Sequence, residues 1–163
     1  MENLVIRSLI TAADLGACAD LMASSEPWLT LGQGPIESLR YFQQPNRERY
    51  IATLGERLVG FLVLNFQGPF VGYLQAICLA PDCRGRGLGS ALVAFAEGRI
   101  FRDHPNVFLC VSSFNPGARR LYERLGYAVV GELPDYLVAG HSEILMRKTR
   151  GPLRTISPPA TRS

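Results

Sequence analysis

One short stretch of the chain, from Arg84 to Ser90, combines residue types that suit the binding of an anion. Its three glycines let the backbone turn sharply and bring bare N–H groups close to a ligand. A helical pattern starts within the stretch, and the dipole at a helix N-terminus favours negative charge. The stretch therefore predicts a site for a pyrophosphate. The residues of this site are Arg84, Gly85, Arg86, Gly87, Leu88, Gly89 and Ser90.

Other uses of a glycine-rich loop fit this stretch less well. A dinucleotide-binding loop needs the pattern GxGxxG, and Ser90 stands where its third glycine is required. A Walker A loop needs GxxxxGK[ST], which the sequence lacks. A simple tight turn is the structural alternative, although arginines that alternate with glycines at a helix start are unusual for one.

The elements around this loop can be predicted from the spacing of apolar residues. Residues 71–79 are mostly apolar and predict a strand. After the loop, Leu88, Leu92 and Phe95 recur at helical spacing, so an amphipathic helix is expected. The loop would then lie between the end of a strand and the start of a helix.

A second strand-to-helix unit follows about 30 residues later. Residues 107–113 predict a strand, and Asn115 or a neighbour would cap the next helix, with Pro116 at its first position. Tyr122 lies on the apolar face of this helix, where it fits core packing as well as chemistry. Gly126 is placed to end the helix.

The remaining elements complete a mixed α/β sheet with helices on both faces. A capping box at Thr11 and Asp14 would start the first helix, and Pro35 can start a second. Residues 43–48 are polar and turn-like. Further strands are predicted over residues 4–9, 50–54, 58–66, 127–131 and 142–147.

Length and charge limit the class of protein. The 163 residues predict one domain over residues 1–149 and a flexible, basic, proline-containing tail over residues 150–163. Residues 147–163 hold five basic residues and no acid, so the net charge of +3 belongs to the C-terminus and argues against a nucleic-acid partner. No apolar run could span a membrane, and a cytoplasmic location is the default. Four cysteines without a CxxC pair predict reduced thiols and no metal site.

The two strand-to-helix units together resemble the GCN5-related N-acetyltransferase (GNAT) family. One family motif, [Q/R]xxGxG/A after a strand and often preceded by a proline, matches the loop that starts at Arg84 behind Pro81. The second motif, an Asn, an Ala and a Tyr followed by a Gly-aromatic pair, matches NPGARRLYERLGY from Asn115 to Tyr127. The resemblance implies a mostly antiparallel central sheet with one splayed pair of parallel strands and helices on both faces.

The resemblance further implies an acetyl-CoA-dependent N-acetyltransferase. Such an enzyme moves an acetyl group to a primary amine by direct transfer in a ternary complex, without a metal. The loop Arg84–Ser90 would hold the pyrophosphate of coenzyme A, and backbone groups of Ile77–Leu79 would pair with the pantetheine arm. Asn115 would hydrogen-bond that arm, and Arg119 could reach the arm or the phosphates.

The same resemblance implies catalytic roles. Tyr122 would lie near the sulfur and protonate the leaving thiolate, and the backbone N–H of Cys78 would stabilise charge on the thioester oxygen. Many members carry a Glu where Gln75 stands, and others carry one that aligns with Cys110, so neither common base is present. Gln75 could hold a water that relays the proton, or the amine could arrive neutral. Candidate proton acceptors are Glu26, Glu143 and His141.

The acceptor amine would enter between the first two helices and a late hairpin. Relatives often dimerise, so a homodimer is one expectation. One alternative function is a non-catalytic acyl-CoA-binding module, which the missing Glu at Gln75 would suit. Another, suggested by the basic tail alone, is a nucleic-acid-binding domain. The residues expected to line the acceptor site are Glu26, Trp28, Tyr73, Gln75, Tyr136, His141 and Glu143.

Overall fold

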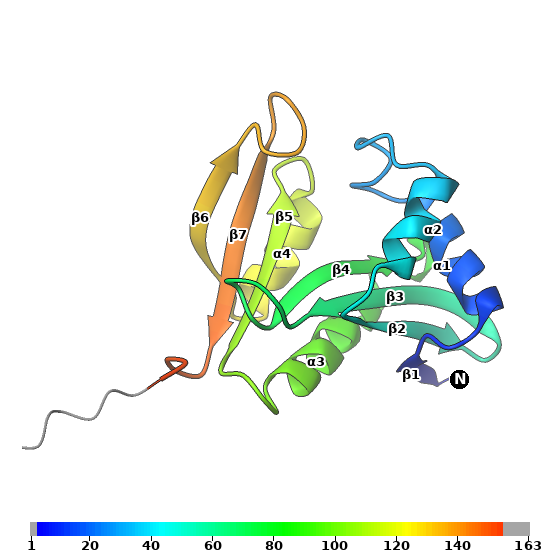
Figure 1. Cartoon of the computed structure of the whole chain (residues 1–163), viewed down its shortest axis with the longest axis horizontal. Helices are drawn as coiled ribbons and strands as arrows, with labels where there is room; N and C mark the ends of the chain where they lie inside the picture. Colours follow the sequence, from blue (N-terminus) through cyan, green and yellow to red (C-terminus); the bar gives the residue numbers. More distant parts are fainter. Residues whose placement is uncertain (1–2, 155–163) are drawn as a thin grey trace, which may run out of the picture.

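The computed structural model describes residues 3–154, which form seven strands, four α-helices and one short 3₁₀ helix. The strands are β1 (Leu4–Ser8), β2 (Arg47–Leu54), β3 (Arg57–Asn65), β4 (Tyr73–Leu79), β5 (Asn106–Ser112), β6 (Ala128–Pro134) and β7 (Ser142–Thr149). The helices are α1 (Ala12–Ala23), α2 (Pro35–Gln43), the 3₁₀ helix η1 (Pro81–Cys83), α3 (Leu88–Ile100) and α4 (Pro116–Arg124). The strands form one sheet in the order β1-β2-β3-β4-β5-β7-β6 (Figure 1).

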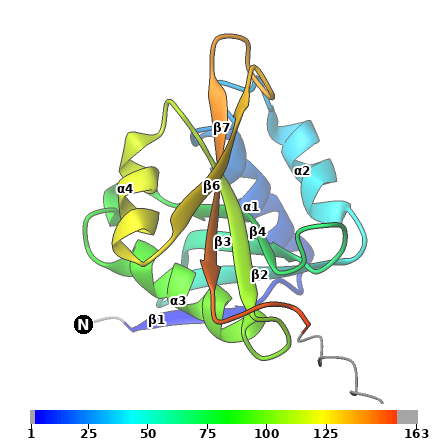
Figure 2. The ribbon, with the colours of Figure 1, turned by 90° about the vertical axis from the view of Figure 1, so that its left-hand side faces the viewer.

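Helices cover both faces of this sheet, with α1 and α2 on one side and α3 and α4 on the other (Figures 1 and 2). Successive residues of a strand point to opposite faces, so β3 contributes to two apolar cores. Phe61 and Val63 pack with Trp28 in the core beneath α1 and α2. Leu62 packs with Leu92 in the core on the side of α3. The sheet is therefore anchored from both sides.

Strands β4 and β5 are parallel neighbours that pair at one end only. Tyr73 pairs with Phe108, and the Phe108 amide donates to the Gly72 carbonyl at 3.0 Å. Within residues 3–154 no further pairing joins these two strands, which diverge from that point (Figure 1). The other neighbouring strands are antiparallel. A mostly antiparallel sheet with one splayed parallel pair and helices on both faces confirms the predicted fold class.

A β-bulge at Gln75 interrupts the pairing of β4 with β3. Val63 pairs with Ala76 and Leu64 pairs with Leu74, so Gln75 has no partner in the ladder. Leu74 and Ala76 consequently lie in different cores, although strict alternation would place them on one face. The direction of side chains in β4 therefore cannot be read from sequence spacing alone.

Local signals in the sequence determine several helix ends as predicted. The Asp14 amide donates to Thr11 Oγ1 at 3.0 Å, and the Thr11 amide donates to the Asp14 carboxylate, which confirms the capping box of α1. Pro35 begins α2, and Gly126, with φ of +92°, follows the last turn of α4. Among the described residues, no helix has the length and apolar character that a membrane span requires.

Several strand boundaries differ from the sequence prediction, and in β2 and β6 pairing with a neighbour extends the strand. β2 begins at Arg47, inside the stretch predicted as a turn, since it pairs with β3 as far as Asn65. β6 starts at Ala128 and continues to Pro134, where it still pairs with Ser142 of β7. The division into a domain over residues 1–149 and a flexible tail stays a prediction, and residues 155–163 of that tail lie outside the described residues.

Gly72, at the point where β4 and β5 part, provides a test of this geometry. It has a φ of +86°, and a Cβ there would come within 2.4 Å of the Asn106 carbonyl oxygen. Gly72→Ala should lower the free energy of unfolding by about 1–3 kcal/mol, measured by urea denaturation. Gly98→Ala is the control, because a Cβ on that helical residue meets nothing within 4 Å. It should raise stability by about 0.5–1 kcal/mol. Equal stability of the Gly72 variant and the wild type would contradict the close approach.

Candidate functional site

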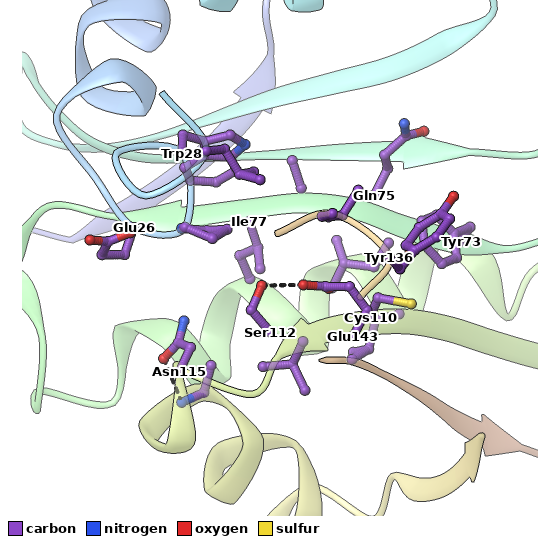
Figure 3. Close-up of a pocket in the computed structure, with 18 of the residues that line it drawn as sticks. Glu26, Trp28, Tyr73, Gln75, Ile77, Cys110, Ser112, Asn115, Tyr136 and Glu143 are labelled. Carbon is purple, nitrogen blue, oxygen red and sulfur yellow. Dashed lines mark hydrogen bonds between the residues drawn. The ribbon is translucent and has the colours of Figure 1, made fainter. Parts of the chain in front are cut away.

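Two cavities meet in the gap between β4 and β5. The larger, about 650 Å³, runs along the N-terminus of α3 and one side of α4, and we call it the loop groove. The smaller, about 380 Å³, lies between the α1–α2 connection, strands β4, β5 and β7, and the β6–β7 loop (Figure 3). We call it the inner cavity. The residues that line both cavities, and so form their junction, are Glu26, Ile77, Asn115, Ala118 and Tyr122.

The loop before α3 presents backbone amides to the loop groove. Gly85 and Gly87 have φ of +71° and +80°, a left-handed conformation that favours glycine. Gly87 is the N-cap of α3 and makes no side-chain capping bond. The Ala91 amide donates to the Gly87 carbonyl at 3.1 Å. The amides of residues 88–90 therefore lie in the first turn of an uncapped helix, an arrangement that suits an anion.

Most of the predicted cofactor-binding residues line the loop groove. Those residues are Ile77, Cys78, Leu79, Arg84, Gly85, Gly87, Gly89, Ser90, Asn115 and Tyr122. Arg86 and Leu88 are not among its lining residues. Arg119 is also outside the lining, and its guanidinium pairs with Glu123 at 2.9 Å on the exposed side of α4. Arg124 of the same helix lines the groove instead, although sequence reasoning did not select it.

The pairing of β4 with β3 decides which way the Cys78 amide points. The Ala80 amide donates to the Val59 carbonyl at 2.8 Å. In an antiparallel ladder such bonds recur at every second residue. Cys78 lies two residues before Ala80 and opposite Phe61, so its amide is directed toward β3 and away from the gap. This corrects the prediction that the Cys78 amide would face a ligand.

The two neighbours of Cys78 face the gap instead. By the same alternation, the backbone groups of Ile77 and Leu79 point away from β3. The Leu79 carbonyl accepts from Arg84 Nε at 3.2 Å on that side of the strand. A ligand that lies in the gap can therefore meet the amides of Ile77 and Leu79.

Asn115 lies at the junction and has two functions available to its amide. Its Oδ1 accepts from the Ala118 amide at 3.2 Å, so the residue caps α4 as predicted. Figure 3 shows the amide nitrogen turned away from the helix and toward the cavity. Helix capping thus fixes the side chain in an orientation that leaves a hydrogen-bond donor for a ligand.

Tyr122 is a buried residue of α4 that also reaches both cavities. Only 6% of it is exposed, and its ring contacts that of Tyr127 at a centroid distance of 5.8 Å. Burial raises the pKa of the Tyr122 hydroxyl. The hydroxyl therefore keeps its proton at neutral pH.

Glu143 brings a carboxylate into the inner cavity where β4 and β5 have separated. It lies opposite Ser112, whose hydroxyl donates to Glu143 Oε1 at 2.5 Å (Figure 3). Counted from the Tyr73–Phe108 pair, Ser112 lies as far along β5 as Ile77 lies along β4. Glu143 is 6% exposed, and burial raises the pKa of its carboxyl more than the Ser112 hydrogen bond lowers it.

Cys110 and Tyr73 extend the same wall of the inner cavity. Burial raises the pKa of the Cys110 thiol, and the hydrogen bond with Tyr73 offsets this in part. Burial likewise raises the pKa of the Tyr73 hydroxyl. Both groups therefore remain neutral at neutral pH, and Glu143 is the ionisable carboxyl on this wall.

Gln75, the bulge residue, is directed away from the Ser112–Glu143 pair in Figure 3. In the amide orientation that satisfies its hydrogen bonds, its oxygen lies 3.1 and 3.2 Å from two guanidinium nitrogens of Arg47. Gln75 does line the inner cavity. Because the amide oxygen of Gln75 already accepts from the Arg47 guanidinium, the geometry does not support the predicted water relay through this side chain.

The other residues predicted for the acceptor site divide into two groups. Glu26, Trp28 and Tyr136 line the inner cavity. The Glu26 side chain is exposed, and its carboxylate accepts from the Thr30 amide at 3.2 Å. His141 lines neither cavity, and its ring contacts Phe114 at a centroid distance of 5.0 Å.

Among the lining residues that sequence reasoning missed, three have side chains that matter for the chemistry of the site. Tyr41 of α2 and Ser112 of β5 line the inner cavity, and Arg124 lines the loop groove. Tyr41 lies on a short helix whose apolar spacing predicted only core packing. Ser112 gains its importance from Glu143, which is remote in sequence.

Residues 3–154 contain no group of three or more His, Cys, Asp and Glu residues that could hold a metal ion.

A model of the acetyltransferase (GNAT) family matches residues 17–127 of the chain. The chain belongs to this family. The two motifs from which the resemblance was predicted both lie within the matched residues. As a member of this family, the protein is an acetyl-CoA-dependent N-acetyltransferase.

Individual relatives show how far the similarity extends. An uncharacterized N-acetyltransferase of Methanocaldococcus jannaschii is 34% identical over 110 residues, which cover 64% of this chain and 70% of that protein. The blasticidin-S acetyltransferase of Streptomyces morookaense is 31% identical over 96 residues, covering 58% of this chain and 70% of that enzyme. The crystal structure of an aminoglycoside 6'-N-acetyltransferase complexed with coenzyme A shares the fold, with a TM-score of 0.73 at 20% identity. That match covers 93% of this chain and 99% of the other.

The raised pKa of Glu143 predicts a pH-dependent loss of stability. The Glu143 carboxyl binds its proton more tightly in the folded protein than in the unfolded chain. Stability therefore falls as the pH rises from the usual Glu pKa of about 4.3 through the raised value. Glu143→Gln should remove that loss. Urea denaturation of both proteins should show the variant gaining in relative stability as the pH increases. A constant difference across this range would contradict the raised pKa.

Proposed function

We propose that the protein transfers the acetyl group of acetyl-CoA to a primary amine by direct transfer in a ternary complex. The observation that carries this proposal is the continuity of the loop groove with the inner cavity at the junction. A donor in the groove and an acceptor in the cavity would meet there without prior acylation of the protein. The structure is that of a family whose enzymes take acetyl groups from acetyl-CoA.

The loop groove has the chemistry that coenzyme A requires. The uncapped amides of residues 88–90 and the guanidinium of Arg84 would hold the pyrophosphate. Arg124 provides a further positive charge along the groove. Ile77, Leu79 and the Asn115 amide nitrogen would bond the amide groups of the pantetheine arm, as an added strand would.

The junction would then contain the reacting atoms. Acetyl-CoA supplies a thioester carbonyl that an amine can attack and a thiolate as the leaving group. Negative charge develops on the carbonyl oxygen during the attack, and a backbone amide directed at it lowers the barrier. The amides of Ile77 and Leu79 face the gap, so one of them would fill the role first predicted for Cys78.

Tyr122 would stabilise the leaving sulfur. Its raised pKa keeps the hydroxyl protonated, and burial is the cause of that shift. A thiol has a pKa of about 8.5, so a thiolate is a weaker base than the Tyr122 oxygen. The hydroxyl would therefore act mainly as a hydrogen-bond donor to the sulfur, which refines the predicted role of a full proton donor.

Glu143 would accept the proton that the amine loses. It lies across the gap near the level of Ile77 and has a raised pKa. A lysine-like amine has a pKa of about 10.4. A raised pKa at Glu143 reduces the difference between the pKa values of the amine and the carboxyl, which lowers the free-energy cost of the proton transfer. Glu26 is the other acidic residue of the cavity, but it is exposed, whereas Glu143 is buried. A cytoplasmic location and a homodimer stay predictions from the sequence.

The proposed reaction releases a free thiol, which can be followed directly. Incubation with acetyl-CoA and a panel of primary amines should release thiol in proportion to N-acetylated product. Tyr122→Phe should lower kcat by about 10²- to 10³-fold, the usual effect of removing one hydrogen-bond donor to developing negative charge, with a small change in KM for acetyl-CoA. Tyr127→Phe removes the hydroxyl of the neighbouring ring, which lines neither cavity, and should change kcat little. If the protein binds coenzyme A but releases no thiol with any amine of the panel, the proposed transfer is contradicted and the alternative of a non-catalytic binding module is supported.

The role of Glu143 predicts a particular pH dependence of kcat. As the pH falls through the raised pKa, the carboxylate gains a proton and kcat should fall. Glu143→Gln should lower kcat by about 10²-fold or more and abolish this fall of kcat at low pH, the acidic limb of the pH profile. Ser112→Ala removes a hydrogen bond that lowers the pKa of Glu143, so the limb should move to higher pH. An unchanged limb in the Glu143 variant would show that Glu26, His141 or another group is the acceptor.

A further inference from the structure

The charges of the inner cavity are of one sign. Glu26 and Glu143 contribute carboxylates, and no Lys, Arg or His is among the described residues that line it. Arg47 lies outside this lining, with its guanidinium 5.3 Å from the centre of the Tyr41 ring and bonded to Gln75. A positively charged ligand would therefore meet attraction and no repulsion from the lining.

Aromatic rings form much of the remaining wall. Trp28, Tyr41, Tyr73 and Tyr136 line the cavity from the α1–α2 connection, α2, β4 and the β6–β7 loop. Burial raises the pKa of Tyr41 to about 12, so its ring stays neutral. Faces of neutral aromatic rings attract cations, and their edges and faces also pack against apolar chains. Such walls suit an apolar spacer that carries positive charge.

The two carboxylates differ in position and in setting. Glu143 is buried beside Ser112, where it is suited to exchange a proton with the reacting amine. Glu26 is exposed, and its carboxylate accepts a hydrogen bond from the Thr30 amide. Figure 3 shows it apart from the Ser112–Glu143 pair. An exposed carboxylate can pair with a cation that does not react.

From these features we infer that the acceptor is a compact molecule with two cationic groups joined by a short apolar spacer. One group is the primary amine that reacts beside Glu143, and the other stays charged and pairs with Glu26. The cavity of about 380 Å³ suits a small molecule. This inference rests on the proposed function, because it names the substrate class of the same site.

A matched set of amines tests the inference. With saturating acetyl-CoA, 1,5-diaminopentane should have a kcat/KM about 10- to 100-fold above those of 1-aminopentane and 5-amino-1-pentanol, which lack the second charge. Glu26→Gln should remove most of this preference by raising KM for the diamine more than KM for either monoamine. Glu56→Gln, in the exposed β2–β3 turn and outside both cavities, is the control and should preserve the preference.

The outcomes separate the two proposals. Transfer to all three amines at equal kcat/KM would overturn the inference and leave the proposed function intact. The same holds if Glu26→Gln lowers kcat/KM equally for the diamine and the monoamine. Absence of transfer to any primary amine, with acetyl-CoA bound, would overturn the proposed function and the inference together.

Discussion

The separation of β4 from β5 is the constraint on which the rest of the site depends. Backbone N–H and C=O groups need hydrogen-bond partners, and beyond Tyr73 the described part of the chain offers β4 a partner strand only on the side of β3. The opposite edge is left to solvent or to a ligand with amide groups of its own. Both cavities open along this edge. A local failure of strand pairing, which would weaken an ordinary sheet, therefore opens the gap in which we propose that donor and acceptor meet.

Burial then determines the proton chemistry of the gap. It raises the pKa of Tyr122, Tyr73, Cys110 and Glu143 alike, because each charged form would lose hydration. The same loss of hydration favours the neutral form of an amine that enters. A carboxylate made more basic and an amine made less basic exchange a proton at a smaller cost.

Sequence patterns predicted those features that arise from neighbours in the chain. The glycine loop before α3, the capping box of α1 and the Asn115 cap of α4 each depend on residues a few positions apart. The prediction for Cys78 was wrong because the direction of its amide depends on the ladder with β3. The side-chain direction of Gln75 follows from a bulge that no spacing in the sequence indicates.

By itself, then, the sequence determined the family, the fold class and the glycine-rich loop before α3, since these rest on motifs and on short-range hydrogen bonding. Only the tertiary structure decided which carboxyl we propose as the proton acceptor. Ser112 and Glu143 are 31 residues apart, and the pairing of β5 with β7 brings them into contact. That contact, and the burial that raises the pKa of Glu143, exist only once distant strands have formed one sheet.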